Sequence, residues 1–133
     1  LVQGKKMIGY VTLGTNKFDD AAKFYDELLA VIGAGRFMES DSFIAWATAP
    51  QSPAISIIRP YDGNDATVGN GMMVAIAAGT TKTVDALHAK ALELGGTDEG
   101  APGTRFDNFY AGYFRDLDGN KLNAFCMTEP GSE

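Results

Sequence analysis

The chain of 133 residues is poor in the residues that build disulfides and soft metal sites, because it holds one cysteine, Cys126, and one histidine, His88. One cysteine cannot form a disulfide within the chain, and one histidine excludes zinc sites that need two or more. Basic residues are also few: 11 Lys and Arg stand against 17 Asp and Glu, which gives a net charge of −6. Nucleic-acid binding needs clustered basic side chains, so the composition argues against nucleic acid as a partner.

Long apolar runs are scarce as well. The longest, from Met72 to Ala78, is far below the roughly 18 residues that a membrane helix needs, so we predict no membrane partner. Residues 1–6 form no apolar leader, and we expect them to be a cloning remnant ahead of Met7. A cytoplasmic location is then the default expectation. The composition, 45% hydrophobic and 21% charged, is that of an ordinary globular protein, and we predict a single domain over residues 7–127.

The sequence contains an internal repeat. An offset of 65 residues aligns Met7–Val31 with Met72–Gly96 and gives seven identities in 25 positions. In both copies a short apolar run leads through Gly-Thr into a stretch whose apolar residues recur at helical spacing. Each copy therefore predicts a strand followed by a helix, and we interpret the chain as a duplicated unit.

The first unit covers about residues 7–59. Its helix is expected over 18–32, with Asn16 as the N-cap, because a short polar side chain there can accept a hydrogen bond from the first helical turn. Short apolar runs bounded by polar, proline or glycine residues predict its strands. The expected strands are 8–14, 36–39, 43–48 and 54–59.

The second unit, 72–127, follows a glycine-rich linker over 60–71. Its helix is expected over 84–94. The segment Asp116–Asn120 predicts a tight hairpin turn, in which Gly119 adopts a positive φ. The expected strands are 72–78, a weak strand within the loop-rich stretch 97–108, 110–115 and 121–127.

Three segments point to a known family. Ala22–Tyr25 (Ala-Lys-Phe-Tyr) lies in the first helix, and Tyr113–Asn120 (Tyr-Phe-Arg-Asp-Leu-Asp-Gly-Asn) precedes the last strand. Together with Tyr10–Asn16 and the paired βαβββ units, they resemble the vicinal oxygen chelate superfamily, which includes glyoxalase I, bleomycin-resistance proteins and extradiol dioxygenases. The resemblance implies an α+β fold in which paired βαβββ modules form an open half-barrel sheet with helices on its outer face. It also implies a homodimer and a cleft in which a divalent metal chelates a small-molecule ligand.

The metal positions of that superfamily fall on residues that do not suit a divalent ion. The resemblance places them at Tyr10, at Ile57, at or near Met73 and at Asn123. A phenol, an isoleucine, a thioether and a neutral amide cannot replace the water shell of a hard cation. We therefore expect a cleft without the metal of the superfamily. No nucleotide cofactor is expected either, because neither a dinucleotide fingerprint nor a P-loop is present.

The same resemblance selects candidate ligand-binding residues. A phenol, a guanidinium and an amide are expected to project into the cleft, and three further aromatic residues are candidates with core packing as the alternative. His88 and Cys126 are interpreted as structural, because each lies toward the buried side of its element. The cleft has no evident catalytic base, and its groups suit a planar or weakly acidic ligand. The candidates are Tyr10, Arg59, Tyr110, Asn123, Trp46 and Phe125.

Three functions are compatible with these residues, and whether the chain is an enzyme is left open. The first is small-molecule binding in a metal-free cleft. The second is a metal-dependent lyase of the lactoylglutathione-lyase type, whose site would join Asn123 to carboxylates such as Glu39 or to residues of a second subunit. The third is sequestration of a cationic drug between two subunits, as in bleomycin-resistance proteins, with which the acidic net charge agrees.

Overall fold

The computed structural model describes residues 6–128, which adopt an α+β fold containing two four-stranded sheets. The first sheet and its helix α1, Phe18–Ala30, form the first module. The strands are β1 (Tyr10–Gly14), β2 (Gly35–Glu39), β3 (Phe43–Ala47) and β4 (Ala54–Ile58). Their order in the sheet is β1-β4-β3-β2, with β1 parallel to β4 and the other pairs antiparallel.

The second module repeats this arrangement around helix α2, Thr81–Glu93. Its strands are β5 (Val74–Ala77), β6 (Thr97–Phe106), β7 (Phe109–Arg115) and β8 (Lys121–Met127). The order β5-β8-β7-β6, with β5 parallel to β8, is the topology of the first sheet. The prediction of an α+β fold with paired βαβββ modules is therefore confirmed.

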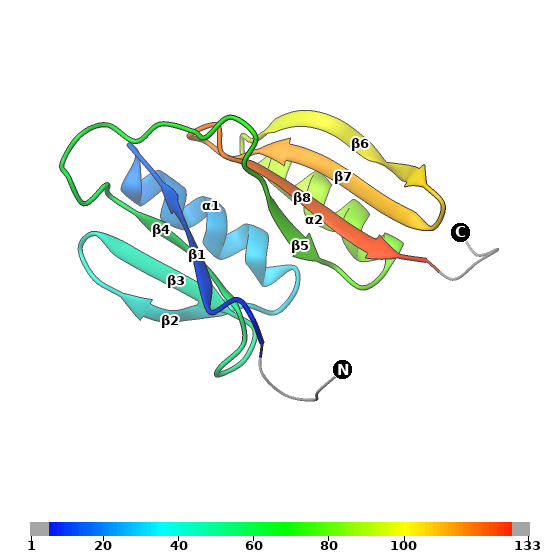
Figure 1. Ribbon diagram of the computed structural model, residues 1–133, viewed down its shortest axis with the longest axis horizontal. Coiled ribbons are helices and arrows are strands. Elements are labelled where there is room, and N and C mark those ends of the chain that lie inside the picture. Colours follow the sequence, from blue (N-terminus) through cyan, green and yellow to red (C-terminus); the bar gives the residue numbers. More distant parts are fainter. Residues whose placement is uncertain (1–5, 129–133) are drawn as a thin grey trace.

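The two sheets lie side by side, and both helices lie behind them in the view of Figure 1. The segment between β4 and β5, drawn in green, crosses from one module to the other along the upper edge. The expected cloning remnant, residues 1–6, lies outside the described residues except for Lys6. Neither α1 nor α2 reaches the length and apolarity needed to cross a bilayer, and residues 6–128 contain no other α-helix.

The structural repeat has a different offset from the sequence repeat. Phe18 and Thr81 begin the two helices, so equivalent helical positions lie 81 − 18 = 63 residues apart. The offset of 65 is therefore two residues too long, although it pairs the correct elements. α2 begins two residues earlier than an offset of 65 would place it. Thr80 caps this start, because its Oγ1 accepts a hydrogen bond from the Thr83 backbone N–H at 3.1 Å.

The N-cap expectation for α1 is wrong. Lys17 occupies the N-cap position without a side-chain cap. The Asn16 side chain instead binds the linker: Nδ2 donates to the Ala66 carbonyl at 3.0 Å, and Oδ1 accepts from the Ala66 N–H at 2.7 Å. A cap residue and a residue that fixes a crossing loop look alike in sequence, because both need a short side chain with a hydrogen-bonding oxygen.

The stretch 97–108 is more regular than expected. β6 extends over ten residues and pairs with β7, with irregular register near Gly100 and Gly103. Gly100, Pro102 and Gly103 make this segment look like a loop in the sequence, because glycine and proline are rare inside strands. Both residues are nevertheless compatible with an edge strand that contains β-bulges. The predicted hairpin turn is present, since Gly119 has a φ of +90° and its N–H donates to the Asp116 carbonyl at 3.0 Å.

Each sheet packs one face on its helix. In the first module the packed residues include Leu13, Ile44 and Ile57, and in the second they include Leu122 and Ala124. Because side chains alternate along a strand, the residues between them lie on the opposite face. We call this opposite side, which faces the viewer in Figure 1, the open face of each sheet.

Candidate functional site

The open face of the first sheet carries Tyr10 at its edge strand. This phenol is 62% exposed, and its ring meets the ring of Phe43 edge-on, with centroids 6.2 Å apart. Ser56 in β4, the register partner of Thr12, is fully buried and donates from Oγ to the Val11 carbonyl at 2.8 Å. Ser56 Oγ is also 3.0 Å from Thr12 Oγ1. A phenol and two hydroxyls therefore supply the polar chemistry of this face.

The fourth-strand metal position requires a correction. Ile57 is 1% exposed and belongs to the core against α1, so it cannot face a cleft. Its two neighbours on the open face are Ser56 and Ile58, and the polar one, Ser56, pairs with Thr12 of β1. The predicted metal position was wrong by one residue because β4, Ala-Ile-Ser-Ile-Ile, is apolar on both faces. Its single polar residue, Ser56, was the one sign of which face is open.

The open face of the second sheet is centred on Asn123. Its register partners are Ala75 in β5 and Tyr113 in β7. Asn123 is 1% exposed, and its side chain makes no hydrogen bond to any residue within 6–128; its Oδ1 is fully buried. Buried amides are nearly always hydrogen-bonded, so this side chain is an exception that calls for a partner.

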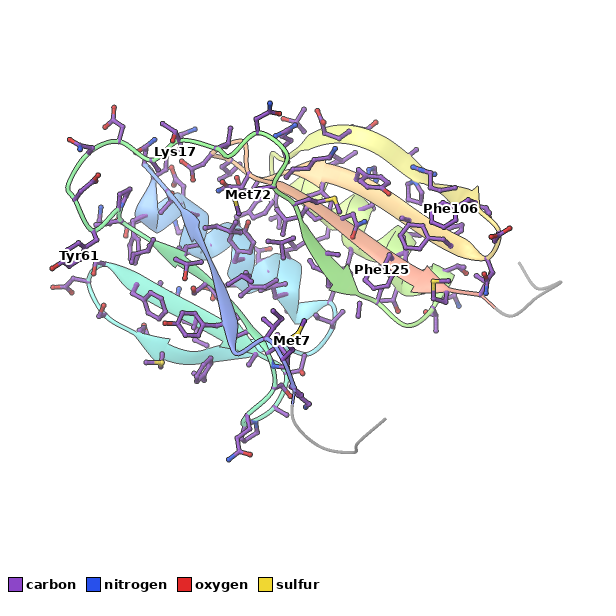
Figure 2. All side chains as sticks on the ribbon, viewed as in Figure 1. Met7, Lys17, Tyr61, Met72, Phe106 and Phe125 are labelled. Atoms are coloured by element: carbon purple, nitrogen blue, oxygen red, sulfur yellow. The ribbon has the colours of Figure 1, made fainter. Side chains whose placement is uncertain are left out.

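Phe125 lies on the same face as Asn123, as alternation predicted. Its ring stacks on that of Phe109 at 5.6 Å between centroids, with an interplanar angle of 19°. Phe109 in turn stacks on Phe106 at 5.0 Å and 11°. Phe125 and Phe106 point from the sheet toward the viewer in Figure 2. The three rings form an aromatic column along one end of the open face.

Cationic side chains surround Tyr113 on this face. The Arg105 guanidinium lies 5.3 Å from the ring centroid, and Lys121 Nζ lies 5.6 Å from it. Neither cation forms an ion pair with a described residue. Arg115, opposite Lys121 in register, is 3.3 Å from Glu99. Sequence reasoning missed these groups, although the i, i+2 spacing from Asn123 already pointed to Lys121.

Three candidate residues lie on the helix sides of their sheets instead of the open faces. The Arg59 guanidinium stacks over Phe18 of α1 at 4.5 Å, so the expectation that it projects into the cleft is wrong. The sequence prediction put Arg59 on the same face of the strand as Ile57, two residues earlier, and Ile57 itself faces α1. Trp46 is 1% exposed in the core, where its Nε1–H donates to Asp26 Oδ1 at 2.8 Å.

Tyr110 is the third candidate residue that lies on the helix side of its sheet. Its hydroxyl donates to Asp85 Oδ1 of α2 at 2.7 Å, and this bond, with burial, raises the pKa of Tyr110 to about 12. The phenol therefore stays protonated and tied to the helix. Of the six candidates, the open faces carry Tyr10, Asn123 and Phe125, while the other three contact the helices.

His88 and Cys126 occupy the structural positions expected of them. Cys126 is 3% exposed in the core, and burial raises the pKa of its thiol. His88 is 5% exposed, and its Nε2 lies 3.0 Å from Asp98 Oδ1. The Gly100 backbone N–H and His88 together lower the pKa of Asp98. Both residues therefore belong to the packing of α2 on its sheet.

With Ser56 in place of Ile57, the four metal positions that the resemblance implies hold Tyr10, Ser56, Met73 and Asn123. They offer a phenol, a hydroxyl, a thioether and an amide, none of them a carboxylate or an imidazole, so this donor set does not fit a divalent metal. Elsewhere in the described part of the chain, no three His, Cys, Asp or Glu side chains gather closely enough to hold an ion.

Two hollows adjoin these faces. A groove of about 500 Å³ runs between β1 and β5, and its wall is mostly apolar, with Ile8, Ile55 and Met73 among its residues. A second hollow of about 540 Å³ lies between the glycine-rich segment 68–73 and the two cations Arg115 and Lys121. The second hollow adds a cationic end to the open face of the second sheet.

Comparisons with known proteins agree with this architecture. The family model described as Glyoxalase/Bleomycin resistance protein/Dioxygenase superfamily matches residues 7–124. A crystal structure of a glyoxalase/bleomycin resistance protein from Albidiferax ferrireducens T118 is similar at 36% identity and a TM-score of 0.85, covering 92% of this chain and 100% of that one. None of the curated proteins matches significantly.

More distant structures show the same fold. A glyoxalase/bleomycin resistance protein/dioxygenase family enzyme from Burkholderia phytofirmans PsJN has 18% identity and a TM-score of 0.71, with 90% of this chain and 98% of that one covered. A lactoylglutathione lyase from Agrobacterium tumefaciens has 16% identity and a TM-score of 0.66, with 94% and 96% covered. From its paired modules, its family match and these structures, the chain belongs to the glyoxalase/bleomycin resistance protein/dioxygenase superfamily, the vicinal oxygen chelate proteins.

Proposed function

We propose that this chain binds a small molecule on its open faces without the divalent metal typical of the superfamily, and that it does so as a homodimer. The observation that carries the proposal is Asn123, a buried amide without a hydrogen-bond partner among residues 6–128, at a position where the resemblance to the superfamily implies a metal ligand. An unpartnered buried amide costs about 1–3 kcal/mol, which a bound ligand would recover.

The donor set argues against the lyase alternative. One structural neighbour is a lactoylglutathione lyase, but at 16% identity it supports the fold alone. A lyase of that type would draw its metal ligands from the positions held here by Tyr10, Ser56, Met73 and Asn123. Glu39, which the sequence offered as a substitute ligand, is instead paired with Arg36 at 2.9 Å on the outer edge strand β2.

Exposed apolar side chains support the homodimer. Ile8 is 47%, Met72 62% and Met73 42% exposed, and all three adjoin β1 or β5. Both strands lie at the edges of their sheets and face each other across the apolar groove. Contiguous apolar surface of this kind marks an interaction site, and a second copy would cover it.

Turnover and binding distinguish the proposal from the lyase alternative. Protein stripped with EDTA is assayed for isomerisation of a hemithioacetal with and without added nickel or zinc, and for ligand-induced thermal stabilisation under the same conditions. The proposal predicts no metal-stimulated turnover and a ligand-induced shift that is equal with and without metal. Turnover stimulated by nickel or zinc would establish the lyase instead.

A further inference from the structure

The open face of the second sheet changes in chemistry along its length. Arg115 and Lys121 form one register pair, Tyr113 and Asn123 form the next, and Phe125 follows. Consecutive open-face positions along a strand are about 7 Å apart. Within the span of one small molecule, the face thus passes from cations through an amide to an aromatic ring.

Apart from Tyr113, the register partners of Asn123 and Phe125 on the open face are mostly small. Ala75 lies opposite Asn123, and Ala77 and Ala111 lie opposite Phe125. Methyl side chains beside an aromatic column leave a flat apolar surface. Such a surface favours a planar ring, because a ring can stack in offset fashion against Phe125 and pack over the alanines.

The end of this face next to the β7–β8 hairpin carries two basic side chains, Arg115 and Lys121, although the whole chain is acidic. Lys121 and Arg105 have no ion-pair partner in the described part of the chain, and Glu99 balances only Arg115. Lys121 and Arg115 also line the hollow of about 540 Å³ beside Gly69–Met73. Local cations of this kind attract an anion and disfavour a cation.

We propose that the open face of the second sheet binds a planar, negatively charged small molecule, its acid group beside Lys121 and Arg115 and its ring over Asn123 and Phe125. This inference rests on the proposed metal-free binding and specifies its ligand class. Asn123 supplies the central polar contact: its unpartnered Oδ1, which is buried, accepts a hydrogen bond from a donor on the ring edge once the ligand displaces the side chains that cover it. The same charge argues against a cationic drug as ligand.

The test uses three probes and the EDTA-treated full chain. Titration calorimetry compares 1-naphthoate, a planar anion, with 1-naphthylmethylammonium, a planar cation, and cyclohexanecarboxylate, a non-planar anion. We expect 1-naphthoate to bind at least roughly tenfold more tightly than either of the others, a difference of one well-made contact. The side-chain amide signals of Asn123 in a ¹H–¹⁵N spectrum should shift with 1-naphthoate.

Two variants and a matched control locate the site. Lys121→Gln should weaken 1-naphthoate binding about threefold to tenfold, and Asn123→Leu should weaken the binding of 6-hydroxy-1-naphthoate, whose hydroxyl supplies a donor on the ring edge, about tenfold or more. Lys82→Gln removes the same charge from an exposed position on α2 and should leave binding unchanged. Thermal melting of each variant shows that it remains folded.

The outcomes separate the two proposals. If 1-naphthoate fails to bind, binds no better than the cation, or binds Lys121→Gln as tightly as the unaltered chain, the ligand class is overturned. Unchanged binding of 6-hydroxy-1-naphthoate to Asn123→Leu would overturn the contact assigned to the amide and, with it, the ligand class. Binding of the cation to metal-free protein, lost in Asn123→Leu, would overturn the ligand class and leave the proposed function standing. Binding of 1-naphthoate only after nickel is added would overturn both.

Discussion

The hydroxyl of Tyr25 in α1 donates to Asp116 Oδ2 in the β7–β8 hairpin at 2.6 Å, so a buried phenol joins the two modules. Asp116 also accepts from the Asn120 backbone N–H and from its Nδ2, at 2.9 and 3.0 Å. Asn120 Nδ2 lies 3.0 Å from the Gly14 carbonyl as well. The Asp-Leu-Asp-Gly-Asn turn therefore fixes the first module against the second.

Removing this link should reduce the stability of the chain. Tyr25→Phe leaves Asp116 buried with one hydrogen-bond donor fewer, and we expect the free energy of unfolding to fall by about 1–3 kcal/mol. Tyr61→Phe removes the same hydroxyl from a fully exposed residue and should change the value by less than about 0.5 kcal/mol. Chemical denaturation measures both; equal stability of the two variants would show that the Tyr25 bond contributes nothing.

Stability should also decline in alkaline solution because of Tyr25. Burial, followed by the negative charge of Asp116, raises the pKa of Tyr25 well above the ordinary value of 10.0. The folded chain therefore keeps the proton while the unfolded chain releases it, so the contribution is complete below pH 10 and declines as the pH rises further, by up to about 1.4 kcal/mol per unit.

Tyr25→Phe lacks this titration, so the stability advantage of the unaltered chain over the variant should narrow between pH 9 and 11. Tyr110, whose pKa is raised to about 12, contributes equally to both proteins and cancels in the difference. Urea denaturation at a series of pH values measures the difference in free energy of unfolding between the unaltered chain and Tyr25→Phe. A difference that stays constant across this range would mean that Tyr25 ionises equally in both states.

Asn123 and Ser56 should respond to apolar substitution in opposite ways. Asn123→Leu replaces an unpartnered amide by a side chain of similar size, so the free energy of unfolding should stay equal or rise, by up to about 2 kcal/mol. Ser56→Ala breaks its bond to the Val11 carbonyl and should lower stability by about 1 kcal/mol. Thermal and urea denaturation test both. Strong destabilisation by Asn123→Leu would assign the amide to the fold instead of to a ligand.

Gly96 should be intolerant of any side chain. An added Cβ would lie 2.7 Å from the Arg115 carbonyl oxygen and 2.8 Å from that of Ala91, both of them backbone atoms. Gly96→Ala should therefore destabilise the chain by about 1–3 kcal/mol through a forced backbone shift. At Gly35 the same added atom meets nothing within 4 Å, so Gly35→Ala is the matched control. Similar melting temperatures for the two variants would contradict the close approach of α2 to β7.

The sequence alone predicts the order of the helices and strands, but it does not predict for every strand which face packs on the helix. Apolar periodicity and glycine-bounded turns predicted both helices, seven strands and the hairpin at Gly119. β6 was recognised only as a weak strand, because Gly100, Pro102 and Gly103 mask an edge strand whose partner tolerates bulges. Its ten residues became evident only with β7 beside it.

The candidate site was predicted in part for a related reason. Alternation placed Asn123 and Phe125 together, and the same rule applied to β7 gives Phe109 and Tyr113. Which face of a strand packs on the helix is decided by the whole module, so spacing alone could not place Arg59 or Tyr110. The amide without a partner was invisible in sequence, since it depends on what surrounds residue 123 in space.

The central claim, ligand binding without a metal, is tested most directly by the metal content of the protein. The chain is loaded separately with nickel, zinc, manganese and iron, desalted, and analysed by mass spectrometry for metal per chain. The account predicts a stoichiometry near zero for every ion, because Tyr10, Ser56, Met73 and Asn123 offer neither carboxylate nor imidazole. About one tightly held ion per chain would contradict it and would make hemithioacetal isomerisation the leading function.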